Sequence, residues 1–527
     1  MQTRTDQDLT SPHQHPNSIV NRYLEGLMRL TYENPLLMRN LIKVVGITSL
    51  SLLAAAPVLS TFLGMDIPVS ATIVATVIGT AGAVVSGGSM FAQHKLFGFP
   101  VEENQQVYKQ KQFISDMAKG ELILDDKNMP TLRIEANNHF HAGYVEGYML
   151  ADAIKVNLEH VSFLYPLMCA FMKAPVSNSG LKAALADILK TIPQAYLEEM
   201  HGKVKGYNAW LGEKHPTLKK LSFEQYLLLQ LLPDIRNYNP FQQLGWSSRI
   251  MPPFNASFAC TTIALRLNGY TIITRVLDWP SHNAAGKYFL QIDRKIAGMK
   301  RTIDIAIPVL TGALTVLNED GLLIEMNIAP GEKIAKPEGM PAVLFNRYCA
   351  ENASCVSDIE RLVANEKPLS AYHLTASDGD KTKSFHFYQN PNIQGTHATE
   401  ALDDNRQSPQ LLVVANHGLQ FEGSEAKVIN HRDSDERKKN IHHLFNRPEM
   451  QTKFTSYINK QELSREDMRE LKEICLQIAR LPLVNNCESV LCAIYIYHHR
   501  QLIDASVATD NLYAQEKELD KFRRVGF

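Results

Sequence analysis

Two strand-like runs near the middle of the chain decide the fold. The first is Cys260-Thr261-Thr262-Ile263-Ala264-Leu265, and the second is Gly269-Tyr270-Thr271-Ile272-Ile273-Thr274-Arg275-Val276-Leu277-Asp278-Trp279. Their β-branched and apolar residues predict two strands, and Gly269 marks the turn between them. Antiparallel strands joined by a short turn bring the end of the second back to the start of the first. The pattern therefore predicts that Arg275 and Asp278 lie near Cys260.

Cys260 is a candidate nucleophile. A cysteine is most reactive as the thiolate, so it needs a cation or a base nearby. If the chain is cut before Cys260, the new α-amine has an ordinary pKa of about 7.7–8.0 and takes the thiol proton. Asp278 then orients the amine, and Arg275 stabilises the thiolate or binds a polar part of the substrate. The alternatives are a buried strand cysteine and an ordinary ion pair between Arg275 and Asp278.

Composition and motifs exclude several classes of protein. The 527 residues carry a formal net charge of -1, and no basic stretch alternates with aromatic residues, so no nucleic-acid partner is expected. Seven cysteines without a Cys-x-x-Cys pair indicate a reducing compartment. His139 and His141 form a His-x-His pair without a nearby third ligand, so no metal is predicted there. The Walker A, Gly-x-Ser-x-Gly and His-Glu-x-x-His motifs are absent.

Four segments are expected along the chain. They are a polar tail with a basic flank (1–40), a transmembrane helical hairpin (41–95), a helical leading segment (96–259) and a catalytic domain (260–527). The hairpin is predicted from two charge-free runs, 44–65 and 67–93, because about 20 residues cross a hydrocarbon core. Lysines and arginines on both flanks predict that the catalytic domain is cytoplasmic. A buried hairpin inside a soluble domain is the alternative.

Periodicity predicts the fold class of the remainder. Residues 96–130 are expected to form a linker with some helix. Apolar residues recur at helical spacing over 181–210 and 222–232, ahead of the nucleophile. After Cys260, blocks of short strands are segregated from blocks of helices, which indicates an α+β fold of stacked layers.

Five sequence blocks, in matching order over about residues 131–500, resemble the linear-amide group of N-terminal-nucleophile (Ntn) hydrolases. That group includes acid ceramidase, N-acylethanolamine amidase, choloylglycine hydrolase and penicillin acyltransferases. The blocks are Cys260 to Thr262 with Arg275 and Asp278-Trp279; Leu317 to Leu322 with Asn327; Val413 to His417 with Asn416; Ser434 to Arg437; and Ser489 to Tyr497. Gly143 to Gly147 and Tyr196 to Gly202 resemble the leading segment of the acyltransferase branch. The chain departs from the family pattern at Thr274, where a Gly is usual, and at Val276, where an Asn is usual.

The resemblance implies a four-layer αββα sandwich with Cys260 as an N-terminal nucleophile released by autocatalytic cleavage. Asn327 and Asn416 would donate hydrogen bonds to the oxyanion, and Arg437 would hold the site in place. The implied enzyme is an amidohydrolase that cleaves a non-peptide linear C–N amide through a thioester. No metal or organic cofactor is expected.

The expected partners are a small-molecule amide and a membrane, and a membrane tether favours a lipid-like acyl group. Two alternatives stay open: an acyltransferase that uses the same thioester, and a non-catalytic membrane-associated protein that keeps the fold. The sequence does not determine the oligomeric state, the membrane or the substrate.

Overall fold

The computed structural model divides the chain into two units, 1–105 and 106–527. The described residues all belong to the second unit; they are 108–125, 127–164, 178–234, 238, 259–279, 286–331, 334, 336–388, 397–402, 408–422, 425–429, 433–485, 489–509 and 517–527. The predicted polar tail and transmembrane hairpin therefore lie outside the described residues. Within the described ranges, no helix combines the length and apolar character needed to cross a membrane.

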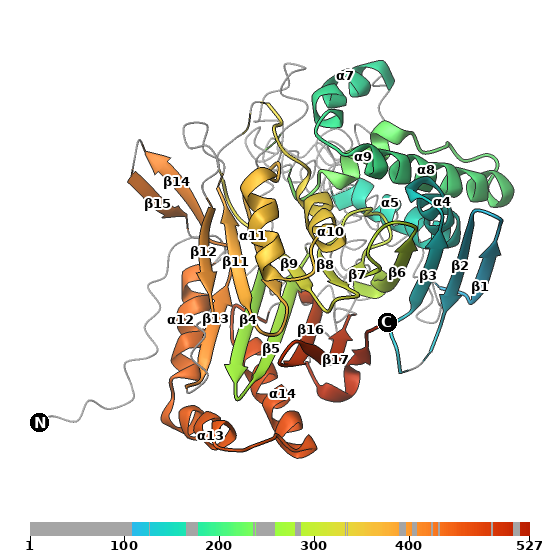
Figure 1. Ribbon diagram of the computed structural model, residues 1–527. Coiled ribbons are helices and arrows are strands. Elements are labelled where there is room, and N and C mark those ends of the chain that lie inside the picture. The colour runs from blue at the N-terminus through green and yellow to red at the C-terminus, as the bar shows by residue number, and fades with distance from the viewer. Residues whose placement is uncertain are drawn as a thin grey trace, which may run out of the picture. The chain divides into compact units, whose positions relative to one another are not determined.

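Strands in the described ranges form two large sheets and a two-stranded ribbon (Figure 1). The first sheet has the order β1-β2-β3-β6-β7-β8-β9-β10-β11-β12. Its strands are β1 Lys111–Ile114, β2 Ala118–Ile123, β3 Thr131–Ala136, β6 Leu290–Ile296, β7 Thr302–Ala306, β8 Thr315–Asn318, β9 Leu323–Ile328, β10 Tyr372–Ser377, β11 Thr382–Phe387 and β12 His397–Ala401. All neighbours are antiparallel except the parallel pair β3 and β6.

The second sheet contains the candidate nucleophile. Its order is β13-β4-β5-β16-β17-β18, and every neighbouring pair is antiparallel. The strands are β4 Ala259–Leu267, β5 Tyr270–Asp278, β13 Gln410–Val414, β16 Ser489–His498, β17 Gln501–Ala508 and β18 Arg523–Arg524. The ribbon consists of β14 Gly418–Glu422 and β15 Glu425–Ile429.

Helices cover the outer face of each sheet (Figure 1). On the first sheet lie α4 His139–Met149, α10 Ala342–Asn352 and α11 Val356–Asn365. α8 Gln194–Lys214 packs on α4, α5 Ala151–Leu164 contacts both, α9 Phe223–Gln230 contacts α8, and α7 Asn178–Leu189 contacts α9. On the second lie α12 Ser434–Phe445, α13 Pro448–Ile458 and α14 Arg465–Ala479. Because β4 also contacts β9, the two sheets face each other. The described residues thus have the predicted layer order of helix, sheet, sheet and helix.

The two faces of β4 pack against different layers. Ile263, Leu265 and Leu267 join the apolar cluster formed with α12, α13 and α14, whereas Cys260 and Ala264 belong to the cluster on the opposite face. Side chains alternate between the faces of a strand, so this division follows from the period of two in the sequence. Cys260 therefore points between the two sheets.

The turn between β4 and β5 has the geometry that the sequence indicates. Leu267 pairs with Tyr270, which leaves Asn268 and Gly269 as a two-residue loop. Both have positive φ, 48° and 76°, as the favoured two-residue hairpin turn requires. This turn sets the register in which Thr262 lies opposite Arg275.

The leading segment differs from its prediction in one respect. Residues 96–130 were expected to be a linker, but β1 and β2 form within them and extend the first sheet. β1 lies at the edge of the sheet and exposes Gln112 and Ile114, and β2 exposes Lys119; the strands have only 4 and 6 residues, so their sequence signal is weak. Through β3 the segment before Cys260 pairs directly with β6, which follows Cys260 in the chain.

Four glycines bring α4 and α8 into backbone contact. A Cβ atom at Gly143 or Gly147 would collide with the backbone of α8, and one at Gly202 or Gly206 would collide with that of α4. Each pair has i, i+4 spacing, which puts both glycines on the same side of their helix. Close approach of the helices places the charged residues between them within reach of one another.

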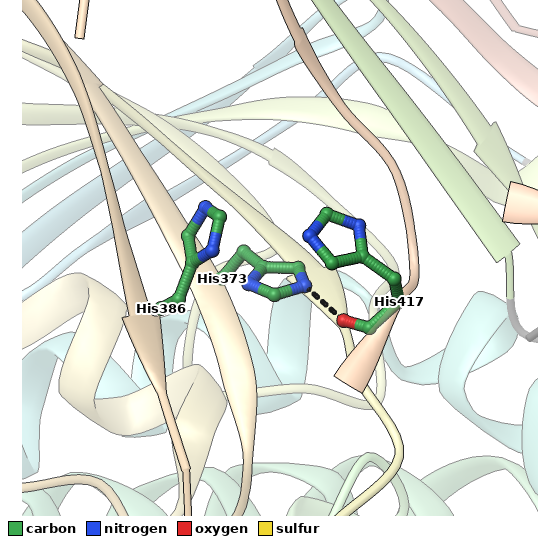
Figure 2. Close-up of side chains that lie close together, drawn as sticks. All are labelled: His373, His386 and His417. Atoms are coloured by element: carbon green, nitrogen blue, oxygen red, sulfur yellow. Dashed lines mark hydrogen bonds between the residues drawn. The ribbon is translucent and has the colours of Figure 1, made fainter. Parts of the chain in front are cut away.

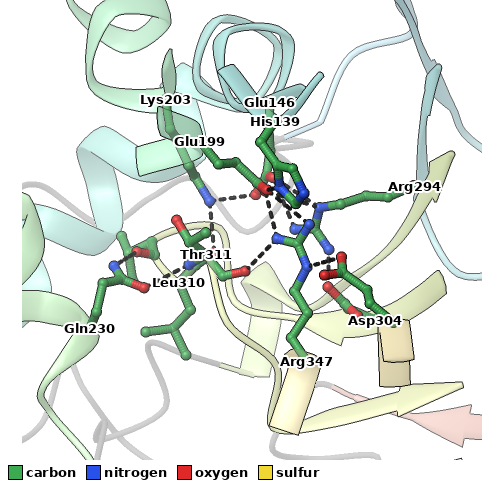
Figure 3. A network of polar contacts seen from close by, with 12 residues as sticks. His139, Glu146, Glu199, Lys203, Gln230, Arg294, Asp304, Leu310, Thr311 and Arg347 are labelled. Carbon is green, nitrogen blue, oxygen red and sulfur yellow. Dashed lines mark hydrogen bonds and ion pairs between the residues drawn. The ribbon is translucent and has the colours of Figure 1, made fainter. Parts of the chain in front are cut away.

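A buried network of ion pairs joins this helix pair to the part of the chain after Cys260 (Figure 3). Lys203 of α8 pairs with Glu146 of α4, and Glu146 also accepts from Arg294 of β6 at 2.9 Å. Arg347 of α10 donates to both oxygens of Glu199, at 2.5 and 2.9 Å. Burial alone raises the pKa of Glu199, but its cationic neighbours, led by Arg347, lower it below the usual value.

Replacing Arg347 with Met should destabilise the fold by about 3–5 kcal/mol, because it removes the cation that two buried carboxylates share. Arg347 also donates to Glu351 at 2.9 Å, and all three side chains are shielded from solvent. Denaturant unfolding followed by circular dichroism measures the change. In the matched control Lys453→Met, which breaks an exposed pair with Glu470, the change should stay below about 1 kcal/mol. Equal effects of the two substitutions would contradict the structural role of the network.

Candidate active site

The backbone N–H of Cys260 is bound by the side chain of Asn416, which follows β13, the strand next to β4 in the second sheet. This N–H donates to Asn416 Oδ1 at 2.7 Å, just beyond the end of β13. Asn416 Nδ2 in turn donates to the carbonyl of Ile328 at the end of β9, at 2.6 Å. Asn416 is therefore fixed between the two sheets with its oxygen on the Cys260 nitrogen.

Arg437 binds the same group of atoms from the helical layer. It lies in the first turn of α12, and its Nη2 donates to Asn416 Oδ1 at 2.8 Å. Its Nη1 donates to the Cys260 carbonyl at 2.9 Å and to Thr261 Oγ1 at 2.8 Å. A planar guanidinium offers donors in a rigid fork, so one side chain orients both Asn416 and the backbone of Cys260.

The sulfur of Cys260 faces Arg275. Residues 260 and 275 are diagonal neighbours on one face of the β4–β5 pair, a separation that a long side chain spans. Arg275 Nη2 lies 3.8 Å from Sγ and also donates to the Met326 carbonyl at 2.6 Å. Its Nη1 donates to Asn327 Oδ1 at 3.3 Å.

Burial dominates the acidity of the thiol. Cys260 is 2% exposed, and this burial raises its pKa to about 11. The Arg275 cation acts in the opposite direction, Asp278 adds to the increase, and Arg437 and the Ile328 N–H lower the pKa. In the uncut chain the thiol is therefore protonated at neutral pH.

Asp278 ends β5 directly opposite Ala259, one residue before the nucleophile. Its Oδ1 accepts a hydrogen bond from Ser489 Oγ at 2.8 Å, across the β5–β16 pair. Asp278 was predicted to orient the nitrogen of Cys260, whereas in the uncut chain Asn416 accepts a hydrogen bond from that nitrogen. Asp278 is close enough for its charge to act on the thiol.

The structure thus brings all six predicted residues to one end of the β4–β5 hairpin. Five of them are linked to one another by hydrogen bonds: Cys260, Arg275, Asn327, Asn416 and Arg437. The sixth, Asp278, lies opposite Ala259, the residue before Cys260. Their catalytic roles remain predictions. Convergence of residues from β4, β5, β9, β13 and α12 required the tertiary fold.

Two residues of this cluster are missing from the sequence prediction. Thr262 Oγ1 donates to Glu325 Oε2 at 3.0 Å and to Asn327 Oδ1 at 3.1 Å. Arg275 Nη1 lies 3.9 Å from the same carboxylate oxygen, and burial raises the pKa of Glu325. The sequence signal that could have found Glu325 is the strand period of two, which puts Glu325 and Asn327 on the same face of β9.

The two departures from the family pattern lie on the other face of β5. Val276 packs in the apolar cluster with α12, α13 and α14, and Thr274, two residues earlier on β5, lies on the same face of the strand. Neither side chain points toward Cys260. The departures therefore leave the polar face of the hairpin unchanged.

Residues able to ligate a metal lie together at a different place from the His-x-His pair. His139 Nδ1 contacts Glu199 Oε2 at 2.7 Å and is part of the buried ionic network. Among the described residues, the group able to hold a metal ion is His373, His386 and His417 (Figure 2). His417 follows Asn416 in the chain, and His373 lies opposite Asn327 in the first sheet. This cluster was not predicted from the sequence.

Fold and site together define a layered α+β protein with a buried cysteine whose nitrogen and sulfur are each held by polar side chains. Neither a protein-family model nor a curated protein sequence matches the chain. Solved structures similar to it include a Caenorhabditis elegans N-acylethanolamine-hydrolyzing acid amidase ortholog, at 12% identity and a TM-score of 0.31, over 51% of this chain and 100% of that one. Two variants of the conjugated bile acid hydrolase from Clostridium perfringens follow at 12% and 11% identity, with TM-scores of 0.28 and 0.27, each over 51% of this chain and 97% of the other.

Replacing Asn416 with Ala should destabilise the fold by about 2–4 kcal/mol, because the Cys260 N–H, Arg437 and the Ile328 carbonyl each lose a buried partner. Thermal and urea unfolding measure the loss. Asn365→Ala is the control: that side chain is exposed and donates to the carbonyl of Arg361 in its own helix, so its removal should cost less than about 0.5 kcal/mol. If Asn416→Ala unfolds like the wild type, the hydrogen bonds to Cys260 do not hold the site.

Proposed function

We propose that the chain is a cysteine amidohydrolase that cleaves linear C–N amides, with Cys260 as its N-terminal nucleophile after a cut between Ala259 and Cys260. One observation carries this proposal: the nitrogen and the sulfur of Cys260 are both held by polar side chains, at 2.7 Å from Asn416 Oδ1 and 3.8 Å from Arg275 Nη2. A cysteine that only packs in the core does not require these two polar contacts. A nucleophile that serves as its own base needs both atoms fixed.

The uncut chain and the cut chain differ in their chemistry. A peptide nitrogen does not accept a proton, and the thiol of the intact chain has its pKa raised to about 11. A free α-amine at Cys260 has an ordinary pKa of about 7.7–8.0, so it accepts the thiol proton near neutral pH. Asn416 Oδ1 and Asp278 would then accept from the amine that replaces the peptide N–H. Cleavage therefore activates the thiol.

The proposed reaction proceeds in two steps. The α-amine takes the proton of Cys260 Sγ, and the thiolate attacks the carbonyl carbon of the substrate amide. The C–N bond breaks, the leaving amine receives the proton, and a thioester between the acyl group and Sγ remains. Water then attacks the thioester, which releases a carboxylic acid and restores the thiol.

Each neighbouring side chain has a proposed part in this reaction. Arg275 stabilises the thiolate because its guanidinium lies against Sγ. Asn327 and Asn416 each use one amide hydrogen in a bond to a backbone carbonyl, and their second hydrogen is assigned to the oxyanion of the tetrahedral intermediate. Arg437 is a positioning residue, since it binds the carbonyl of Cys260 and the oxygen of Asn416.

An acyltransferase is the second candidate, because an amine in place of water at the thioester step requires no further residue. Adding a primary amine to the reaction separates the two. A hydrolase continues to release mainly carboxylic acid, whereas an acyltransferase forms the new amide at the expense of the acid. A non-catalytic protein with this fold would do neither.

Cys260→Ala should abolish both processing and amide hydrolysis. We expect the wild type to separate under denaturing conditions into two chains that meet at 259/260, and the variant to stay intact. Turnover of a fluorogenic N-acyl amide should fall by at least about 1,000-fold, since the nucleophile is lost. Intact mass spectrometry and the amidase assay give the two readouts.

In the same experiment the two wild-type chains should co-elute on native size exclusion, because β3 pairs with β6 and the buried ionic network crosses the cut. Cys355→Ala, at a half-buried cysteine away from the site, is the control and should be cut and active. An intact wild type that is not labelled by a thiol-reactive acyl probe would sink the proposal.

Membrane attachment through 41–95 is part of the proposal, and it rests on the two charge-free runs in the sequence. The full-length chain should resist extraction from membranes by alkaline carbonate. Leu53→Asp combined with Val77→Asp puts a charge into each run and should release the chain into the supernatant. Ser18→Asp, in the polar tail, should leave the chain in the pellet. Full extraction of the wild type would show that the hairpin does not span a membrane.

A further inference from the structure

Three histidine rings converge beside the candidate active site (Figure 2). His373 of β10 and His386 of β11 are cross-strand partners in the first sheet, with ring centroids 4.1 Å apart. His417 follows β13 of the second sheet, and its ring centroid lies 5.0 Å from that of His373 and 5.5 Å from that of His386. One ring nitrogen of each residue lies within 4.8 Å of the other two. The cluster thus joins the two sheets.

Each of the three rings has a buried nitrogen without a hydrogen-bond partner among the described residues. These atoms are His373 Nδ1, His386 Nε2 and His417 Nδ1. His373 Nε2 donates to the His417 carbonyl at 2.6 Å; a carbonyl only accepts, so the proton is on Nε2 and Nδ1 keeps its lone pair. A buried polar atom left without a partner destabilises the fold, so three in one place point to a missing ligand.

We infer that His373, His386 and His417 bind a divalent transition-metal ion, with Zn²⁺ as the fitting choice. Imidazole nitrogen is a preferred ligand of zinc and its neighbours in the first transition series, and three histidines with a fourth position for water form a known type of zinc site. Hard cations such as Mg²⁺ and Ca²⁺ prefer oxygen ligands, which the three rings do not offer.

The surroundings of the rings fit this ligand set. The bond from His373 Nε2 to the His417 carbonyl, and the 3.3 Å contact between His386 Nδ1 and Tyr388 Oη, orient the two rings through their other nitrogens, as metal-binding histidines require. Both rings are shielded from solvent, and burial favours the neutral form of an imidazole. The neutral ring is the form that ligates metals.

Charged groups around the cluster are few and balanced. Glu400 of β12 and Lys438 of α12 act on His386 and His417, and they pair with each other at 3.3 Å. Asp435 and Arg437, on the same helix, act on His417 with opposite signs. No carboxylate is bound to the three rings among the described residues, so the ion would be held by nitrogen and water.

Metal binding requires the rings to move closer. Tetrahedral zinc with Zn–N bonds of about 2.1 Å needs ligand nitrogens about 3.4 Å apart, whereas here the upper bound is 4.8 Å. His417 is the ligand best placed to close this distance, since it lies outside a strand and is only half-buried. Its backbone continues from Asn416, which accepts the N–H of Cys260.

The ion would therefore fasten the segment carrying Asn416 to the first sheet. His373 lies opposite Asn327 in the β9–β10 pair, so both amide side chains of the candidate site are next to a proposed ligand. This role is structural and independent of the thioester chemistry. The prediction of no metal did not take these three histidines into account; they are 13 and 31 residues apart in the chain and so lack a ligand-type spacing.

Metal binding by the full-length chain, purified without a histidine tag and stripped with a chelator, tests this inference. Titration against a chromophoric zinc chelator should show one equivalent of tightly bound Zn²⁺, and Zn²⁺ should raise the melting temperature. His386→Gln and His417→Gln should each weaken Zn²⁺ binding by at least about 100-fold, because each removes a ligand. His443→Gln, at an exposed histidine of α12, is the matched control and should bind like the wild type.

Cys260→Ala should also bind one equivalent of Zn²⁺, so the result does not depend on whether the chain is an amidase. Co²⁺ bound to the wild type should give the intense visible absorption of a tetrahedral site without a sulfur-to-cobalt charge-transfer band; this spectrum decides the matter even if both ligand variants fail to fold. Three results would overturn the inference: no stoichiometric Zn²⁺, a Co²⁺ spectrum that indicates octahedral or sulfur ligation, or wild-type affinity in both His386→Gln and His417→Gln.

Discussion

The geometry of the site depends on the pairing of β4 with β5 across Asn268 and Gly269. Two residues with positive φ close the hairpin, and this loop length sets which residues lie opposite each other. A shift of one residue would move every side chain of a strand to the other face. Cys260 would then point at the helices of the outer layer, and Arg275 would no longer lie on the face of the thiol. The apolar residues on the outer face oppose such a shift, because they are buried against α12, α13 and α14.

Four polar side chains of the candidate site are buried around that hairpin. Arg275, Arg437, Asn327 and Asn416 are all shielded from solvent, and each forms hydrogen bonds within the cluster. Burying such groups is tolerated when their hydrogen bonds are satisfied with good geometry. The same burial raises the pKa of the thiol, so the intact chain holds a protonated Cys260 among these polar groups. In the proposed enzyme, the amine released at position 260 would supply the base that the intact chain lacks.

Contacts between the parts of the chain before and after residue 260 explain how such a cut would leave the fold intact. The parallel pair β3–β6 joins strands from before and after the nucleophile, and the ion pairs of Glu146 and Glu199 do the same for the helices. Close packing of α4 on α8, through glycines, keeps both carboxylates within reach of Arg294 and Arg347. The proposed metal ligands His373, His386 and His417 would add a connection between the two sheets on the other side of the site.

The sequence by itself determined the β4–β5 hairpin and the strand and helix blocks after Cys260, because these follow from local periodicity and turn residues. The layer order and the candidates Asn327, Asn416 and Arg437 were implied by the resemblance of its motifs, whereas Cys260, Arg275 and Asp278 were also predicted from the hairpin itself. The sequence did not show that β1 and β2 extend the first sheet, since both strands are short and β1 exposes an apolar residue, Ile114, which gives a weak pattern. Nor did it show that Asn416 accepts from the Cys260 nitrogen, that Glu325 and Thr262 join the cluster, or that three histidines meet. Those facts depend on which strands become neighbours, and strand order is set by the packing of distant segments. Only the tertiary structure decided them: the local sequence determines which face a side chain occupies, and the fold determines what that face meets.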